Sequence, residues 1–246
     1  IPVETSENYK ILQQKESKNT AVNAIFKHYW VLNNFNHIYT TLGNKYNNES
    51  FFTEDSQQLA DGTTNNFASA GFGNDLDYQL NDLFLGVHYK FKTGIFELKQ
   101  GAFLHAYNWD LDQQFSKKSN KIVLLPDFSA EIKFSNSKKI KLNYQLKSAF
   151  SNASKLANRF YLQSYNSVYK GNEHLENELY HSARMYYSRF SLYRGLMLFG
   201  GINYSKKIKG LQNAVQFNET DQYVSPILVA YASENWSFNL NIDKKI

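Results

Sequence analysis

The side chains that could do chemistry are spread along the chain in patterns that match no metal-binding motif. No histidine belongs to an HExxH or His-x-His pattern, in which two imidazoles could bind one zinc ion. The sequence also lacks cysteine, which excludes thiolate metal sites, a cysteine nucleophile and disulfides. We therefore expect no metal site and no cofactor, although His88 and His105 could share one face of a sheet. The histidines are His28, His37, His88, His105, His174 and His181.

Acidic residues gather at two places, and neither place matches a catalytic or calcium-binding motif. The first group lacks the central glycine and the terminal glutamate of an EF-hand loop. The second group could serve an enzyme on the rim of a barrel, but a solvated charged loop explains it more simply. Because there is also no Gly-x-Ser-x-Gly elbow, we expect the chain not to be an enzyme and to hold no catalytic residue. The groups are Asp75, Asp77 and Asp82, then Glu173, Glu176 and Glu178.

The composition favours strands joined by polar loops. The 246 residues include 37 Tyr and Phe and 28 Asn, with only 3 Pro. Aromatic residues favour strands, whereas Asn favours turns and disfavours helices. The net charge of +5 comes from scattered lysines, so nucleic acid is not an expected partner. No run of 18 apolar residues is present, which excludes a transmembrane helix. The sequence predicts an all-β protein.

Strict alternation of apolar and polar residues is the main signal for strands with two different faces. It is clearest over 140–150, where we expect one face to meet lipid and the other to meet a lumen. The first face carries Leu142, Tyr144 and Leu146, and the second carries Lys141, Asn143, Gln145 and Lys147. The same alternation occurs at 83–91, 96–105, 128–134 and 236–242.

Short and long connections alternate along the chain. This asymmetry is typical of an antiparallel up-and-down transmembrane β-barrel, with short turns in the periplasm and long loops outside the cell. We expect about ten strands of a larger barrel and assign 1–246 to a single outer-membrane β-barrel domain. The short turns are expected at 33–36, 92–94, 135–139, 189–195 and 232–235. The long connections are expected at 48–79, 108–120, 152–177 and 206–222.

Aromatic residues lie at both ends of several expected strands. Spacings of about ten residues suit the thickness of a membrane, so the sequence predicts an aromatic girdle at each interface. The alternative is the aromatic core of a soluble β-protein. The expected girdle residues beside the short turns are Trp30, Phe91, Phe96, Phe134, Tyr193 and Trp236, and those at the far ends are Tyr107, Trp109, Phe150 and Tyr204.

The two ends of the sequence are unusual for a whole protein. Ile1-Pro2-Val3 has no initiator Met and no signal-peptide pattern, and 241–246 stops inside an alternating stretch. We expect a piece of a larger protein, with a processed mature chain as the alternative.

Residues 154–192 resemble the late-barrel signature of Bacteroidetes outer-membrane β-barrel proteins of the TonB-dependent receptor type. The family pattern, Gly-Asn-x-x-Leu-x-x-Glu followed by a strand that contains Tyr-Tyr-Ser, is present, but the usual prolines are absent. Glu173 and Asn177 stand in their places. The matching residues are Gly171, Asn172, Leu175 and Glu178, followed by Tyr186-Tyr187-Ser188.

This resemblance implies a barrel of roughly 22 strands that is closed by an N-terminal plug and energised through TonB. The expected partners are outer-membrane lipid, the TonB system through a plug absent from this chain, and an extracellular ligand of unknown identity. The expected location is the bacterial outer membrane, and the expected function is that of a transport receptor. An outer-membrane barrel enzyme, an adhesin and a soluble carbohydrate-binding β-sandwich stay open as alternatives, as does a self-contained ten-stranded barrel.

Overall fold

The computed structural model describes residues 1–4, 10–191, 193, 195–218, 221–230 and 233–244. This part of the chain is built almost entirely of strands, and none of its helices is long and apolar enough to cross a membrane. The elements are β1 (Ile11–Asn33), β2 (Asn36–Gln58), β3 (Thr64–Asn66), η1 (Phe67–Ala70), β4 (Asn74–Thr93), β5 (Phe96–Asp112), β6 (Lys117–Ser135), β7 (Lys138–Ala149), α1 (Ala153–Leu156), β8 (Phe160–Ser164), β9 (Ser167–Lys170), β10 (Glu178–Ser191), β11 (Leu196–Asn218), β12 (Asp221–Val229) and β13 (Ser233–Lys244).

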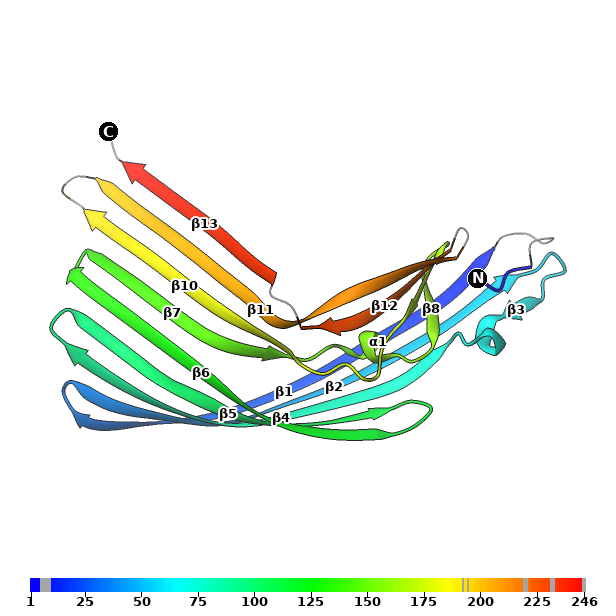
Figure 1. Ribbon diagram of the computed structural model, residues 1–246, viewed down its shortest axis with the longest axis horizontal. Helices are drawn as coiled ribbons and strands as arrows, with labels where there is room; N and C mark the ends of the chain where they lie inside the picture. The colour runs from blue at the N-terminus through cyan, green and yellow to red at the C-terminus, as the bar shows by residue number, and fades with distance from the viewer. Residues whose placement is uncertain (5–9, 192, 194, 219–220, 231–232, 245–246) are drawn as a thin grey trace.

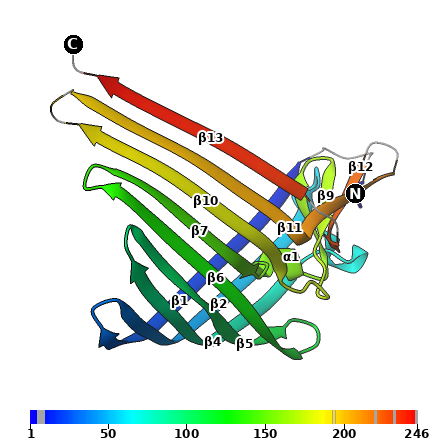
Figure 2. The same ribbon diagram turned by 60° about the vertical axis from the view of Figure 1, so that its left-hand side comes forward.

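The strands form one curled sheet with the order β1-β2-β4-β5-β6-β7-β10-β11-β12-β9-β8. Neighbouring strands are antiparallel except for β12 and β9, and β12 and β13 share one edge of β11 by pairing with different halves of it. The sheet curves into a half-barrel with a concave and a convex face (Figures 1 and 2). The expectation of an antiparallel barrel wall is therefore confirmed, and ten of the strands, β1, β2, β4–β7 and β10–β13, build that wall.

The convex face carries a continuous apolar band. Leucines occupy the same level on four successive strands, directly opposite one another in the register, and each is about half exposed: Leu42 at 50%, Leu85 at 49%, Leu104 at 47% and Leu124 at 60%. On the other half of the wall, a second row consists of Leu142, Met185, Ile202 and Phe238. Toward the 113–116 connection the same face becomes polar within four residues of the leucine row on each strand. The residues at that level are Tyr46, Asn81, Asn108 and Asn120.

The two clusters of buried hydrophobic residues in the described part of the chain lie at one end of the half-barrel. There α1, β8 and β9 fill the concave side and pack against β2 and β4 (Figure 1). The carboxylate of Asp55 on β2 is buried and accepts hydrogen bonds from Gln13 Nε2 of β1 at 2.8 Å and from the Leu162 amide of β8 at 3.3 Å. The last strand of the sheet order is therefore tied back to the first two. At the end with the short turns, the described part of the sheet stays open between β1 and β13.

The strands are longer than the alternation predicted, so the predicted loops are partly wrong. The ladder continues through much of 48–79, 108–120 and 206–222, because backbone pairing does not require an apolar convex face. In β4, for example, exposed Asp75 alternates with buried Leu76 and Tyr78, so the apolar side chains there lie on the concave face. The connections between wall strands shrink to 59–73, which holds β3 and η1, and to 113–116. The connection at 152–177 is a folded insert made of α1, β8 and β9.

The predicted short turn at 232–235 is also placed differently. Residues 231–232 lie outside the described residues, and β13 starts at Ser233, opposite Lys207 in the middle of β11. From there β13 runs toward the short turns, so its start lies far from them (Figure 1). Trp236 consequently packs against Tyr204, with ring centroids 4.4 Å apart, instead of standing at the rim of the short turns.

The apolar row predicts a difference between two neighbouring positions on β7. In the full-length protein folded into phospholipid bilayers, Leu142→Arg should lower the free energy of unfolding by about 2 to 4 kcal/mol, because it places a charge on the face that meets lipid. The matched variant Asn143→Arg, on the concave face, should cost much less. Urea unfolding in vesicles measures both, and equal losses would contradict this assignment of faces.

Candidate functional site

Two aromatic rings on the concave face, Phe84 of β4 and Phe103 of β5, each extend over a glycine of the neighbouring strand. A Cβ atom at Gly43 would lie 2.3 Å from the Phe84 ring, and one at Gly86 would lie 2.3 Å from the Phe103 ring. Each of these glycines is directly opposite its ring on the adjacent strand. A side chain at either position would displace its ring, so the glycines allow the rings to pack closely over the sheet as an aromatic floor.

The floor continues along β5 as a run of stacked rings. The ring centroids of Phe84 and His105 are 5.1 Å apart, and those of His105 and Tyr107 are 5.3 Å apart. Tyr107 then meets Phe150 at 4.7 Å, where the chain leaves β7 for the insert. The rings therefore form a continuous row on the concave face, from the middle of the half-barrel to the end that holds the insert of α1, β8 and β9.

Two histidines on this floor are each held by an aspartate. Asp82 accepts a hydrogen bond from His105 Nδ1 at 2.7 Å, and Asp127 pairs with His88 Nε2. Both imidazoles are buried on the concave face, so the expectation that they share a face is confirmed. Their partners are different aspartates, and nowhere in the described ranges do three or more His, Cys, Asp or Glu come together as a group that could hold a metal ion.

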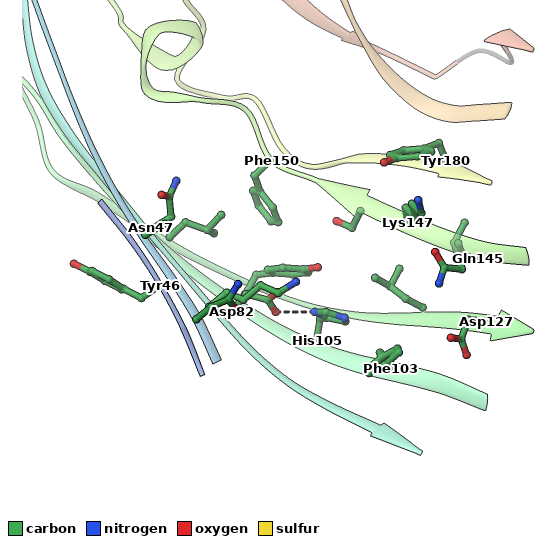
Figure 3. A pocket seen from close by; sticks show the side chains of 18 of the residues that line it. Tyr46, Asn47, Asp82, Phe103, His105, Asp127, Gln145, Lys147, Phe150 and Tyr180 are labelled. Atoms are coloured by element: carbon green, nitrogen blue, oxygen red, sulfur yellow. Dashed lines mark hydrogen bonds and ion pairs between the residues drawn. The ribbon is translucent and has the colours of Figure 1, made fainter. Parts of the chain in front are cut away.

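A cavity of about 510 Å³ opens on the concave face between the two halves of the wall. Figure 3 shows side chains from β2, β4–β7 and β10 around it, with the Asp82–His105 pair on its floor. The cavity offers carboxylate, amide and ammonium groups beside ring faces, which suits binding of a polar ligand more than it suits bond cleavage. Its polar side chains include Asp82, His105, Asp127, Gln145, Lys147 and Tyr180.

The acidic groups singled out from the sequence do not converge. Asp75 and Asp77 are exposed on the convex face of β4, whereas Asp82 is buried on the concave face, because strand residues five apart point to opposite sides. Glu173 accepts from Gln113 Nε2 at 3.0 Å, away from the lysines that hold Glu176.

The predicted aromatic girdles are split between the two faces. Tyr107, Trp109 and Phe150 lie on the concave face and pack together, which differs from the prediction that they meet lipid. The reason is parity: Tyr107 and Trp109 lie an even number of residues from Phe103, so they share its face. Tyr193 is fully exposed in the turn after β10. On the convex face, a girdle stays a prediction for Trp30, Phe91, Phe96, Phe134, Tyr204 and Trp236.

The first half of the family-like motif locks the insert. Gly171 is buried so tightly that a Cβ atom would lie 2.6 Å from the carbonyl oxygen of Lys155. The amide of Asn172 donates to that same carbonyl at 2.8 Å, and its side-chain amide donates to the Pro226 carbonyl at 3.3 Å. These two residues therefore join α1, the motif loop and β12.

The second half of the motif joins the insert to the wall. Leu175 is buried in the core cluster, and Glu178 accepts from the Leu211 amide at 2.7 Å and from Lys207 Nζ at 3.0 Å. The four motif residues are placed to hold the fold, and the ligand contacts of this chain stay unknown. The glycine–aromatic pairs were not predicted from the sequence. Glycines within strand segments, Gly43, Gly86 and Gly101, were a signal for such close packing.

Comparison with solved structures finds similar folds at low sequence identity. The crystal structure of the ferric citrate transporter FecA in the unliganded form matches 94% of this chain at 11% identity, with a TM-score of 0.57. The siderophore receptor PirA from Pseudomonas aeruginosa matches 91% of this chain at 11% identity, with a TM-score of 0.43. The chain spans 32% of the FecA chain and 53% of the PirA chain. No family model and no curated protein matches the sequence.

The floor geometry predicts a difference between two glycines. Gly86→Ala should lower the free energy of unfolding of the full-length protein by about 1 to 3 kcal/mol, because its methyl group overlaps the Phe103 ring. Gly200→Ala is the matched control, since the nearest atom to its Cβ is 3.6 Å away. The double variant Gly86→Ala/Phe103→Leu should recover most of the loss. Urea unfolding measures all three, and an equal loss in Gly86→Ala and Gly200→Ala would refute the packing argument.

The ion pairs of Glu176 make the stability of the motif loop, residues 171–178, depend on pH. Hydrogen bonds from Lys121 and Lys209, each at 2.8 Å, lower the pKa of Glu176 from 4.5 to about 2. Because the folded pKa is the lower one, the stabilisation is present above about pH 4.5 and is lost as the pH falls through about 2. The side chain is half exposed, so solvent screening keeps the effect small and local.

The rate of pepsin cleavage at buried Leu175 measures how often this loop opens in the full-length protein. At pH 4.5, Glu176→Gln should be cut several-fold faster than the native protein, because the loop opens more often without its ion pairs. At pH 1.5 the two rates should converge, since native Glu176 is then protonated. A difference that persists unchanged at pH 1.5 would exclude the carboxylate as its cause.

Proposed function

We propose that this chain is part of the wall of an outer-membrane receptor barrel that takes up an extracellular ligand. The observation that carries the proposal is the contrast between the two faces of the same strands. The convex face is apolar across the middle of the wall, and the concave face carries charged groups, buried His–Asp pairs and stacked rings. Only a wall between lipid and a polar lumen requires both faces at once.

The exposed convex face argues against a soluble β-sandwich. A sandwich buries one face of its sheet against a second sheet about 10 Å away. In the described residues the leucines of the convex row are about half exposed, and no second sheet covers them. Lipid is the solvent in which such a row is favourable.

The strand lengths support the proposed orientation. A tilted strand needs about 9 to 11 residues to cross the hydrocarbon layer. β1, β2 and β11 each have 23 residues, so their polar ends stand well outside the membrane. We place the insert of α1, β8 and β9 on the extracellular side and the short turns in the periplasm.

The plug and TonB belong to the proposal through the sequence resemblance. The outer edges of β1 and β13 cannot face lipid unpaired, which supports closure by further strands. A barrel that wide has a lumen that a plug would have to obstruct, with energy supplied from the inner membrane. The similar structure with a TM-score of 0.57 is that of a transporter, which supports uptake over catalysis.

Cysteine labelling on whole cells tests the wall and its orientation, because the native chain has no cysteine. Phe115→Cys, at a position that is 80% exposed in the 113–116 connection, should react with a bulky impermeant maleimide on intact cells. Ser137→Cys, in the turn between β6 and β7, should react only after the outer membrane is permeabilised. The reverse pattern would show the opposite orientation. Equal labelling of both positions on intact cells would show that the chain does not span the outer membrane.

Conductance tests the plugged receptor. In planar bilayers the full-length protein should be closed, and a variant without the plug should form large open channels. If the full-length protein conducts as well as the variant, the plugged-receptor proposal fails and an ungated pore replaces it.

A further inference from the structure

Three lysines that line one cavity on the concave face form no ion pair with any described residue. Lys27 of β1, Lys45 of β2 and Lys99 of β5 line a cavity of about 400 Å³. Within the described ranges none of the three forms an ion pair, whereas eleven other lysines or histidines do. Three positive groups that converge on one cavity repel one another, so an anion there would be stabilised.

The carboxylate nearest to Lys45 in the register is already engaged. Asp82 stands directly opposite Lys45 on β4, where a cross-strand ion pair would be expected. Asp82 instead accepts from His105 Nδ1 at 2.7 Å. The ammonium group of Lys45 lies 5.2 Å from the centroid of the Phe84 ring, over the aromatic floor.

Lys99 is left unpaired in a similar way. Its opposite residue on β4 is Lys90, and the ammonium group of Lys90 takes Glu97 at 2.6 Å. Lys99 Nζ lies 5.3 Å from the centroid of the Tyr39 ring instead. Two further carboxylates on the concave face of β6 are also engaged, Asp127 by His88 and Glu131 by Lys133. None of these carboxylates therefore forms an ion pair with Lys27, Lys45 or Lys99.

The floor of the cavity selects the shape of a ligand. Phe84 and Phe103 extend over Gly43 and Gly86 with their ring planes 70° apart, and Tyr39 adds a third ring. Aromatic rings bind apolar ring systems by stacking or by edge-to-face contact, while the ammonium groups bind negative oxygens. Lys45, Phe103 and His105 also line the cavity of 510 Å³, so the two cavities lie next to each other on the concave face.

We propose that this cavity binds an organic anion with a flat apolar part, such as an aryl carboxylate or aryl sulfonate. The ring system would lie on Phe84, Phe103 and Tyr39, and the anionic group would meet Lys27, Lys45 and Lys99. The inference rests on the proposed function, because it treats the concave face as the route of a ligand. It defines the substrate class of that route as anionic.

Binding of pyrene-1-sulfonate to the purified full-length protein in detergent tests the proposal, with neutral pyrene-1-methanol as the matched probe. Fluorescence anisotropy should show saturable binding of the sulfonate and at least about tenfold weaker binding of the alcohol. Each of Lys27→Gln, Lys45→Gln and Lys99→Gln should raise the Kd of the sulfonate several-fold. Lys141→Gln, on the concave face of β7 outside both cavities, should leave it unchanged.

Three results would overturn the proposal. Equal affinity for the sulfonate and the alcohol would show binding by apolar contact alone. An equal effect of Lys141→Gln would show a general response to the charge of the lumen. Binding that occurs only after the plug is removed would show that the cavity is a plug contact and not a ligand site.

The same variants keep this proposal separate from the proposed function. Cysteine labelling and plug-dependent conductance do not depend on the three lysines. If both succeed while the sulfonate does not bind, only the inference about the anion fails. If labelling places the chain outside the membrane, the proposed function fails whatever the probe does.

Discussion

The cross-strand register is the constraint on which the rest of the structure depends, because a slip by one residue would exchange the two faces of a strand. The leucine row shows the consequence. Leu42, Leu85 and Leu104 meet on the convex face only because 42 pairs with 85 and 85 with 104. The same pairing sets Gly86 beside Phe103 on the concave face. The apolar band and the aromatic floor therefore follow from one set of backbone hydrogen bonds.

The two ends of the half-barrel are stabilised by different means. At the end with the short turns, each hairpin closes locally, and the concave face stays open. At the other end the insert supplies side chains that no local hairpin can provide, and Leu175, Tyr161 and Phe51 share one core with β4. Burial raises the pKa of Asp55 there, against hydrogen bonds from Gln13 and Leu162 that lower it. The buried carboxylate of Asp55 thus connects β8 to β1 and β2 and holds the insert against the wall.

Charge on the concave face is arranged so that some lysines are neutralised and others are not. His88 and His105 occupy Asp127 and Asp82, and Lys90 and Lys133 occupy Glu97. The histidines thus have a physical consequence beyond packing, because each holds a carboxylate that does not form an ion pair with a nearby lysine. The concave face therefore combines aromatic rings with lysines that form no ion pair among the described residues.

The amino-acid sequence by itself determined the strand class, the hairpins at the short turns and the two faces of the segments at 83–91 and 128–134, because period-two alternation is a local property. It did not determine where the strands end. Beyond the apolar band the convex face becomes polar, at Asn81 and Asn108, while the ladder continues and the apolar side chains, such as Leu76, lie on the concave face. Sequence spacing also placed Tyr107 in a girdle, although its parity with Phe103 sets it on the concave face. Only the tertiary structure decided that Lys45 and Lys99 form no ion pair. The reason is that the partner of each nearby carboxylate is a histidine or lysine from a different part of the sequence.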